Sequence, residues 1–478
     1  MFFSETKLHD FVSKLNVYEW NQFTKFLASP FFNKNEDIIK LIASLSPYYK
    51  KKNQIAISKN EAWSLVYDTK KYNDLRFRRL CSDTVSLLDV FFAITQFQKD
   101  PKQQRVFTLA AFNERGLDKY FLNNLNYLAT QSIKRKSIDS YDYWIDYFTA
   151  LQKASFLERT NNRLSDKNIR DTLSKLDDYY LIMKLRFYAA QLHYKQIKTN
   201  DDEDLLMGDI LSYLTTHSIA TNPIANIYWH IINTFTHPDH QKYYSVLNKL
   251  LALHSSAISF EISRDMHAFA LNYCIRQINQ GVTQFQHEIF ILYKRMIEEK
   301  LLFDNEILSP FDFKNIVTIS LRIKEYTWSE HFVSTYHKTL PTEHQRNALS
   351  FNQARIHFAK KEYGNVLDLL QDVEYTDVFY TLDSKTTLFK TYYELGEVLS
   401  MLSLAESFRI LLGRKKLISE QHRINYNNFL KIALKIYKAD AKNQTQLSAI
   451  KKLLTETKGI ADKTWLIEKF EELGGVIK

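Results

Sequence analysis

Glycine and proline are scarce in this chain of 478 residues, with 9 and 7 copies respectively. Average usage in proteins is roughly 7% for glycine and 5% for proline. Folds built from strands and tight turns, and the dinucleotide-binding α/β folds, need glycine at turns and phosphate loops. Long helices joined by short polar turns need little of either residue. The composition therefore favours an all-α protein.

Cysteine is also scarce, since only Cys81 and Cys274 are present. Two distant cysteines cannot build a disulfide framework or a zinc site, so we expect a reducing compartment. The N-terminal residues carry an acid and a base too early for the apolar core of a signal peptide. The most apolar stretch, Leu87–Thr95, is broken by Asp89 and is too short to span a bilayer. We therefore expect a cytoplasmic protein that is neither exported nor membrane-spanning.

Sequence motifs for common chemistries are missing. No glycine-rich loop with nucleotide-binding spacing occurs. His287 does not open a zinc-protease motif, because Ile291 stands where the second histidine is needed. The segment His237–His240 is a compact ligand-like cluster, but its central Pro-Asp pair marks a loop. Asp201–Asp204 lacks the spacing and glycine of a calcium loop, and is expected at a helix N-terminus. Catalysis by serine, cysteine or paired carboxylates leaves no readable pattern. We predict no catalytic, cofactor-binding or metal-binding residues and no enzyme.

Aromatic residues, by contrast, are abundant, with Phe, Tyr and Trp together making up 14% of the chain. Large rings fill the space between helices that cross at an angle. Residues 1–100 show helical periodicity with clear boundaries. Capping-box patterns at Asn16–Glu19 and Ser58–Glu61 predict helix starts, and Ser46-Pro47 predicts a helix end. A long helix is expected from near Asn73 to Asp100-Pro101.

The rest of the chain repeats the helical pattern without a flexible linker. Residues 101–309 read as divergent helical hairpins separated by short polar breaks, and residues 310–478 carry the clearest repeats. Lys324-Glu325-Tyr326 recurs 37 residues later as Lys361-Glu362-Tyr363. A related unit, Tyr392–Val398, follows at a shift of 35 residues from His357–Tyr363. A fixed period in the thirties is typical of helix–turn–helix repeats.

These repeats resemble the tetratricopeptide family, whose units combine small and aromatic residues at fixed helical positions with a polar turn and a closing proline. The residues that match are Ala354, Tyr363 and Leu370 in one unit, Tyr392, Gly396 and Ala405 in the next, and Tyr326 and Pro341 in the first. The small residue expected in the second helix is replaced by Ser329 or Val366. The resemblance covers residues 310–415 and implies a stack of hairpins that binds a macromolecule.

The N-terminal part carries a second resemblance. Phe26-Leu27-Ala28-Ser29-Pro30-Phe31-Phe32-Asn33 is similar to the opening of an uncharacterised bacterial family with an FLxSPFFN-type segment and helical repeats. This resemblance implies a cytoplasmic repeat protein and brings no activity or site.

The fold that follows is all-α, an α-α solenoid of tetratricopeptide-like hairpins with a helical N-terminal cap region. The first helix of each hairpin lines the concave face of such a stack. Position between the apolar residues makes Arg322, Asn352, Arg355 and Lys390 candidates for this groove. We predict a protein–protein adaptor or scaffold whose groove binds a protein segment or helix of unknown identity.

The alternative is a nucleic-acid or ribonucleoprotein-binding protein. The net charge is +10 and the pI about 9.1. In this reading Arg76 and Arg79 share one face of a helix, and phosphate contacts come from nearby lysines. Those lysines are Lys50, Lys51, Lys52 and Lys70. The same residues also fit an ordinary solvated helix face. Lys134-Arg135-Lys136 lies at a predicted helix C-terminus, where cations complement the helix dipole without a partner.

Overall fold

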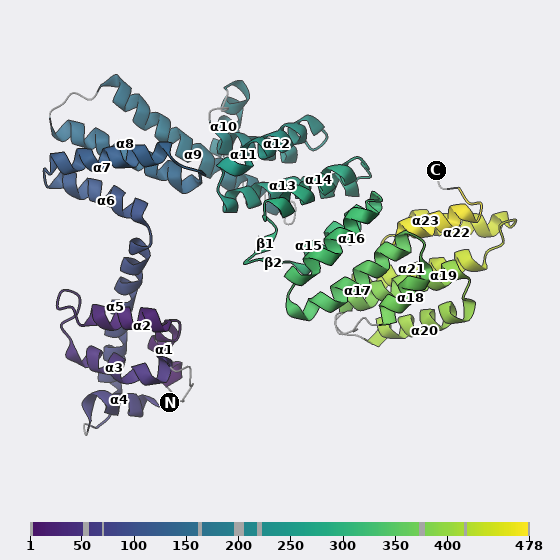
Figure 1. Ribbon diagram of the computed structural model, residues 1–478, viewed down its shortest axis with the longest axis horizontal. Coiled ribbons are helices and arrows are strands. Elements are labelled where there is room, and N and C mark those ends of the chain that lie inside the picture. The colour runs from purple at the N-terminus through teal and green to yellow at the C-terminus, as the bar shows by residue number, and fades with distance from the viewer. Residues whose placement is uncertain are drawn as a thin grey trace. The chain divides into compact units, whose positions relative to one another are not determined.

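The computed structural model describes residues 3–50, 57–68, 71–160, 165–195, 205–217, 222–371, 378–414 and 418–476. It is about 81% helical, which confirms the predicted all-α class. The chain divides into two compact units, Met1–Lys184 and Leu185–Lys478 (Figure 1). The division falls inside the segment 101–309, which the sequence analysis treated as one array.

The first unit consists of helices joined by short turns. Its elements are η1 (Phe3–Glu5), α1 (Lys7–Val12), α2 (Val17–Leu27), α3 (Glu36–Lys50), α4 (Lys59–Tyr67), α5 (Asp74–Gln98), α6 (Pro101–Glu114), α7 (Asp118–Ile133), α8 (Ser140–Arg159) and the first part of α9 (Asp166–Lys195).

Helix α5 is the centre of the N-terminal core. It packs against α1, α2 and α3 and buries Phe77, Leu88 and Phe91 among their apolar side chains. By length and composition α5 could cross a membrane. Of its most apolar 18-residue window, 33% is buried inside the structure. Both predicted capping boxes are confirmed, at Asn16–Glu19 and Ser58–Glu61.

The predicted end of α3 at Ser46-Pro47 is wrong, because the helix continues to Lys50 with Pro47 inside it. A proline within the last turn removes only one backbone donor, and packing can offset that loss. Tyr49 in this last turn is partly buried and packs against the N-terminal core. Its ring stacks on Trp20 at 5.4 Å, and its hydroxyl lies 2.5 Å from His9 Nδ1.

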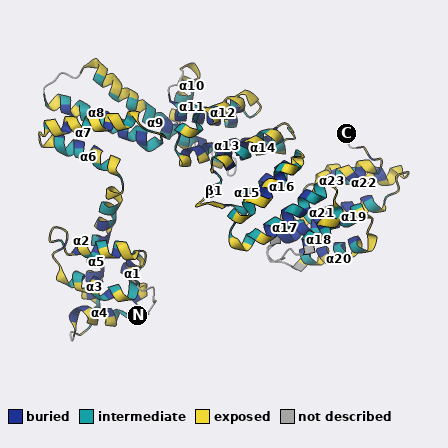
Figure 2. Ribbon diagram, viewed as in Figure 1, coloured by how far each residue is buried: buried dark blue, intermediate teal, exposed yellow. Residues whose placement is uncertain are grey.

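Helices α6, α7 and α8 enclose a second apolar core in this unit. The rings of Phe121 and Phe156 stack at its centre, with centroids 4.3 Å apart. Buried residues follow one side of each helix, as Figure 2 shows, which is the pattern of amphipathic helices.

The second unit is also helical, apart from one short β-ribbon. Its elements after α9 are α10 (Leu205–Thr216), α11 (Pro223–Thr236), α12 (Gln241–His254), η2 (Ser255–Ala257), α13 (Phe260–Asn279), α14 (Phe285–Glu298), β1 (Phe303–Asp304), β2 (Ile307–Leu308), α15 (Pro310–Arg322), α16 (Tyr326–Tyr336), η3 (His337–Thr339), α17 (Thr342–Ala359), α18 (Tyr363–Gln371), α19 (Val378–Leu395), α20 (Val398–Arg414), α21 (Glu420–Lys438), α22 (Gln444–Glu456) and α23 (Lys463–Glu472).

Packing in this unit follows the order of the chain. From α11 to α22 each helix packs against the next one, and α11, α15 and α17 also pack against the second helix along (Figure 1). Helices α19 to α23 share an apolar core with Phe389, Phe408 and Phe429 fully buried. Neighbour-to-neighbour packing of this kind is typical of stacked helical hairpins.

The turns predicted to be equivalent have the same backbone geometry. Lys324 and Lys361 both have φ of 64°, and Gly396 has φ of 72°. At each turn the left-handed residue donates its N–H to a carbonyl three residues earlier, and the next residue donates to one five residues earlier. This is the Schellman helix end. Gly281, with φ of 93°, ends α13 in the same way and extends the series by one hairpin.

The β-ribbon was not predicted. Strands β1 and β2 pair antiparallel, with Phe303 opposite Leu308 and Asp304 opposite Ile307. Asn305 and Glu306 both have positive φ, as a two-residue hairpin turn requires. Leu308 is fully buried, so the ribbon is anchored in the core between α14 and α15.

Candidate functional site

Polar side chains on the first helices of successive hairpins form hydrogen bonds and ion pairs in the second unit, and Arg322 acts on them only through its charge. We call this set the first-helix strip. It consists of Lys314, Thr318 and Arg322 on α15, Asn352 and Arg355 on α17, Asp383 and Lys390 on α19, Tyr426 on α21, and Asp462 just before α23. Helices α15, α17 and α19 pack in this order, which brings the strip together.

Arg355 bridges two hairpins within the strip. Its Nη2 donates to Thr318 Oγ1 at 2.9 Å, and its Nη1 donates to Asn352 Oδ1 at 3.3 Å. The guanidinium also lies 5.6 Å from the centroid of the Phe351 ring. Burial lowers the pKa of Arg355, and this outweighs the opposite effect of Asp383. A guanidinium has five N–H donors, so two bonds leave donors for a further acceptor.

Asp383 joins α15, α19 and α21. Its carboxylate forms an ion pair with Lys314 and accepts a hydrogen bond from the Tyr426 hydroxyl at 2.7 Å. Burial raises the pKa of the Tyr426 hydroxyl, and the Asp383 charge raises it further. The tyrosine therefore stays protonated and acts as a donor. These contacts join residues 69 and 43 positions apart in the chain.

Lys390 and Asp462 form the C-terminal end of the strip. Lys390 Nζ lies 2.5 Å from Asp462 Oδ2 and 4.4 Å from the centroid of the Phe358 ring. Burial raises the pKa of Asp462, but Lys390, Arg355 and Arg322 outweigh that effect and hold it below its usual range. The Asp462 carboxylate is therefore ionised at neutral pH, within the field of cations from three helices.

The predicted groove residues have different environments. Arg322 is exposed and Arg355 is half-buried. The Lys390 side chain retains 12% of its exposure. Asn352 is fully buried, so its prediction as a groove contact is wrong. It lies on the side of α17 that packs on its neighbours, donates to the Ala348 carbonyl at 2.8 Å and accepts from Arg355. Asn352 thus positions the guanidinium.

The partners of these cations were not predicted from the sequence. Lys314, Asp383, Tyr426 and Asp462 belong to the strip only because distant helices meet. The one sequence signal was the 37-residue shift between the repeats, which places Thr318 and Arg355 at equivalent positions.

The predicted nucleic-acid residues are only partly described. Lys51, Lys52, Lys70 and the side chain of Lys50 lie outside the described residues.

The two described arginines of this set differ from one another. Arg76 Nη2 lies 3.4 Å from Asp37 Oδ2, and its guanidinium lies 4.4 Å from the Tyr67 ring centroid. Arg79 is exposed and has no ion-pair partner within the described part of the chain. Arg76 is therefore partly neutralised, and Arg79 is the more accessible cation of the two.

The remaining candidates from the sequence are histidine and cysteine side chains. Among the residues that the structure describes, no group of three or more His, Cys, Asp and Glu side chains is placed to hold a metal ion. His237 and His240 have ring centroids 5.9 Å apart on the turn between α11 and α12. Cys81 and Cys274 are buried free thiols, and burial raises the pKa of each to about 12. Thiols with such pKa values are poor nucleophiles at neutral pH.

Comparison with known proteins gives no relative for this chain. No family model, no curated protein and no solved structure matches it. The tetratricopeptide resemblance and the likeness of the Phe26–Asn33 segment therefore stay predictions.

Proposed function

We propose that this chain is a cytoplasmic, non-enzymatic adaptor of tetratricopeptide-like hairpins, and that the first-helix strip binds an acidic segment of a partner protein. The observation that carries this proposal is the charge of the strip. It holds four cations (Lys314, Arg322, Arg355 and Lys390) and two carboxylates, Asp383 and Asp462.

The excess of cations favours a partner with carboxylate side chains. Arg322 is exposed, and Arg355 keeps unused N–H donors. The planar donor fork of arginine matches a carboxylate in a bidentate arrangement, which gives both strength and orientation. Because these two residues come from successive hairpins, a bound segment would cross the helices rather than follow one of them.

The state of the strip carboxylates supports binding over catalysis. Asp383 is occupied by Lys314 and Tyr426, and Asp462 is occupied by Lys390. The lowered pKa of Asp462 makes this carboxylate a weak proton acceptor. The same ion pairs join α15 to α19 and α19 to the start of α23, which fixes these helices relative to one another and reduces the ordering cost of binding a partner.

The proposal is tested by titrating three fluorescent twelve-residue peptides, rich in Glu, rich in Lys or neutral, into the full chain at low salt. We expect the Glu-rich peptide to bind tightest, and its affinity to fall as salt rises. Arg322→Glu should weaken it about tenfold or more. Arg322 forms no ion pair within the described residues, so this change leaves the packing intact.

The matched control is Lys338→Glu, which reverses an exposed charge on η3 outside the strip. This variant should bind the Glu-rich peptide within about twofold of the unchanged chain, because rim charges away from a contact contribute little. Equal binding of acidic and basic peptides, or equal losses in both variants, would refute the proposal. The nucleic-acid alternative would be supported if the chain binds a single-stranded DNA oligonucleotide, and if Arg79→Glu lowers this affinity but Arg322→Glu does not.

A further inference from the structure

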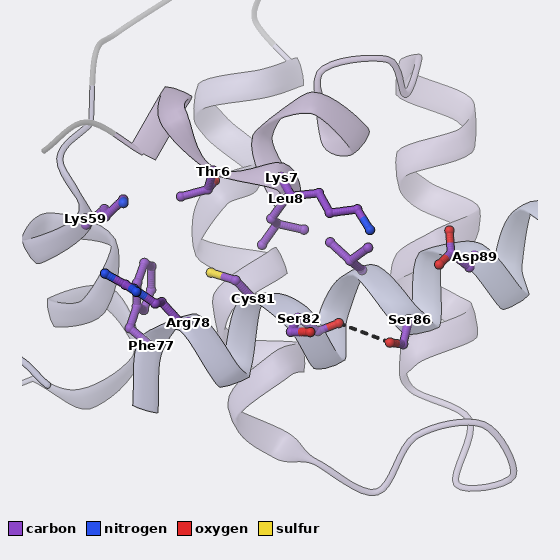
Figure 3. Close-up of a pocket in the computed structure, with 11 residues that line it drawn as sticks. Thr6, Lys7, Leu8, Lys59, Phe77, Arg78, Cys81, Ser82, Ser86 and Asp89 are labelled. Atoms are coloured by element: carbon purple, nitrogen blue, oxygen red, sulfur yellow. Dashed lines mark hydrogen bonds between the residues drawn. The ribbon is translucent and has the colours of Figure 1, made fainter. Parts of the chain in front are cut away.

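The first unit contains a cavity of about 370 Å³ between its N-terminal residues and helices α4 and α5 (Figure 3). This volume lies near the lower end of the roughly 300–1,000 Å³ range of ligand pockets. Its lining comes from the N-cap and first turn of α1, from the start of α4 and from α5. The residues are Thr6, Lys7, Leu8, Lys59, Phe77, Arg78, Cys81, Ser82, Val85, Ser86 and Asp89.

One wall of the cavity is apolar. Leu8 and Phe77 are almost fully buried, and Cys81 and Val85 retain 8% and 4% exposure. The Cys81 sulfur points into the cavity in Figure 3. Burial raises the pKa of this thiol to about 12, and Lys59 only partly counters the effect. The thiol therefore stays protonated and contributes apolar surface to the wall.

The rim of the cavity is charged, with three cations and one carboxylate. Lys59 and Arg78 lie at one end, and Asp89 lies at the other (Figure 3). Arg78 pairs with Asp74 at 2.7 Å, and both side chains remain largely exposed. Lys59 and Arg78 both help to lower the pKa of Asp74, after the hydrogen bond from Tyr72. The end formed by Lys59 and Arg78 thus has two cations near one acid.

We propose that this cavity binds a small amphipathic anion, in which a carboxylate or similar head group is carried by an apolar body. The head would meet Lys59 and Arg78, and the apolar body would lie against Leu8, Phe77 and Val85. This end has two cations near one acid, so a cationic ligand would face repulsion there, and an anionic head group would be attracted. The proposal concerns the first unit and does not depend on the first-helix strip.

The experiment measures binding of decanoate, decanol and acetate to the full chain by isothermal titration calorimetry. Decanoate is expected to bind saturably, at least about tenfold more tightly than decanol or acetate, since only decanoate combines both features. Arg78→Gln should weaken decanoate about tenfold, because a charge-assisted hydrogen bond is lost. Arg79→Gln is the matched control on the same helix. It removes an exposed arginine outside the lining and should leave the affinity within twofold.

A second readout uses Cys81 as a probe of occupancy. In a Cys274→Ser background, Cys81 is the remaining thiol. Its reaction with the neutral reagent 4,4′-dithiodipyridine should slow as decanoate saturates the cavity, and should not respond to acetate. This readout stays valid if Arg78→Gln perturbs folding.

Three outcomes would overturn the proposal. The first is equal affinity for decanoate and decanol, and the second is equal loss of affinity in Arg78→Gln and Arg79→Gln. The third outcome comes from incubating the chain with phosphatidylglycerol vesicles. If the chain co-sediments with the vesicles but does not bind free decanoate, the cationic rim binds a membrane surface rather than a small anion.

Discussion

At the scale of single residues, the left-handed turn positions are the clearest sites for a stability test. Lys324 and Lys361 adopt a φ that costs an L-residue roughly 1–2 kcal/mol, and glycine avoids that cost. Both side chains are exposed. We expect Lys361→Gly to raise the free energy of unfolding by about 0.5–1 kcal/mol. Chemical denaturation with urea measures this change.

Gly396 is the matched reverse case, because it occupies the same turn position one hairpin later. An added Cβ there meets no atom within 4 Å, so Gly396→Ala isolates the backbone effect. It should lower the free energy of unfolding by about 1 kcal/mol. If Lys361→Gly and Gly396→Ala shift stability in the same direction, the equivalence of the two turns is wrong.

His267 on α13 makes the second unit sensitive to acid. The ring is fully buried, its Nδ1 lies 2.7 Å from the Ser263 carbonyl oxygen, and its Nε2 has no hydrogen-bond partner among the described residues. Burial lowers the pKa of His267 to about 4, although the Ser263 hydrogen bond acts in the opposite direction. Protonation would place an unpaired charge in the core.

The sign of the pH effect follows from this lowered pKa. Between the folded value of about 4 and the unfolded value of about 6.5, only the unfolded chain takes up the proton. Stability should therefore fall as the pH drops through this window, by up to roughly 3 kcal/mol. Urea denaturation at pH 7 and pH 4.5 measures the slope, which His267→Met should flatten. The exposed His331→Met is the control and should leave the slope unchanged.

At the scale of helices, an ion cluster fixes the turn between α7 and α8. Arg135 forms two hydrogen bonds to Asp146, at 2.8 and 2.7 Å, and lies 3.5 Å from Asp142. Lys102 on α6 reaches Asp142 at 2.6 Å. Burial lowers the pKa of Arg135, but Asp146, Asp142 and Asp139 outweigh it and raise the pKa overall. The expectation that this arginine only complements a helix dipole was therefore wrong.

Breaking the cluster should be costly, since its groups are largely buried. The Arg135 and Asp142 side chains retain 12% and 5% exposure. We expect Arg135→Met to lower the free energy of unfolding by about 3 kcal/mol, because the Asp146 carboxylate loses its main partner and Asp142 keeps only Lys102. Arg115→Met removes an exposed pair with Glu114 and should cost less than about 0.5 kcal/mol. Similar losses in the two variants would contradict a structural role for the cluster.

Helix boundaries could be read from the sequence where a local signal decides them. Asn16 and Ser58 cap helices as expected, because a capping box involves residues only three positions apart. The end of α3 was predicted wrongly from Pro47. A proline in the last turn costs little stability, and the packing of Tyr49 against Trp20 offsets that cost.

The candidate site was less predictable than the helices, since its contacts join distant positions. Position between the apolar residues indicated Arg322, Arg355 and Lys390, but Asp383 and Asp462 become their neighbours only through the fold. Asn352 looked like a surface residue because it is polar. It is buried because its amide groups bond within α17.

At the scale of the whole molecule, the division at residues 184 and 185 predicts two unfolding transitions. Each unit has its own apolar core, so each can melt with its own cooperativity. Differential scanning calorimetry of the full chain should resolve them. Arg135→Met should lower the transition temperature of the first unit only. Gly396→Ala should lower the transition temperature of the second unit only. A single transition shifted by both changes would show that the chain unfolds as one body.

The shared main-chain geometry at Gly281, Lys324, Lys361 and Gly396 has an evolutionary consequence. These turns are held by backbone hydrogen bonds and do not depend on particular side chains. The sequences on either side of such a turn can therefore diverge while the turn keeps its geometry. Duplication or loss of a whole hairpin leaves the backbone geometry of every other turn unchanged. A lineage built this way can alter its length in steps of one hairpin while its sequence drifts beyond recognition.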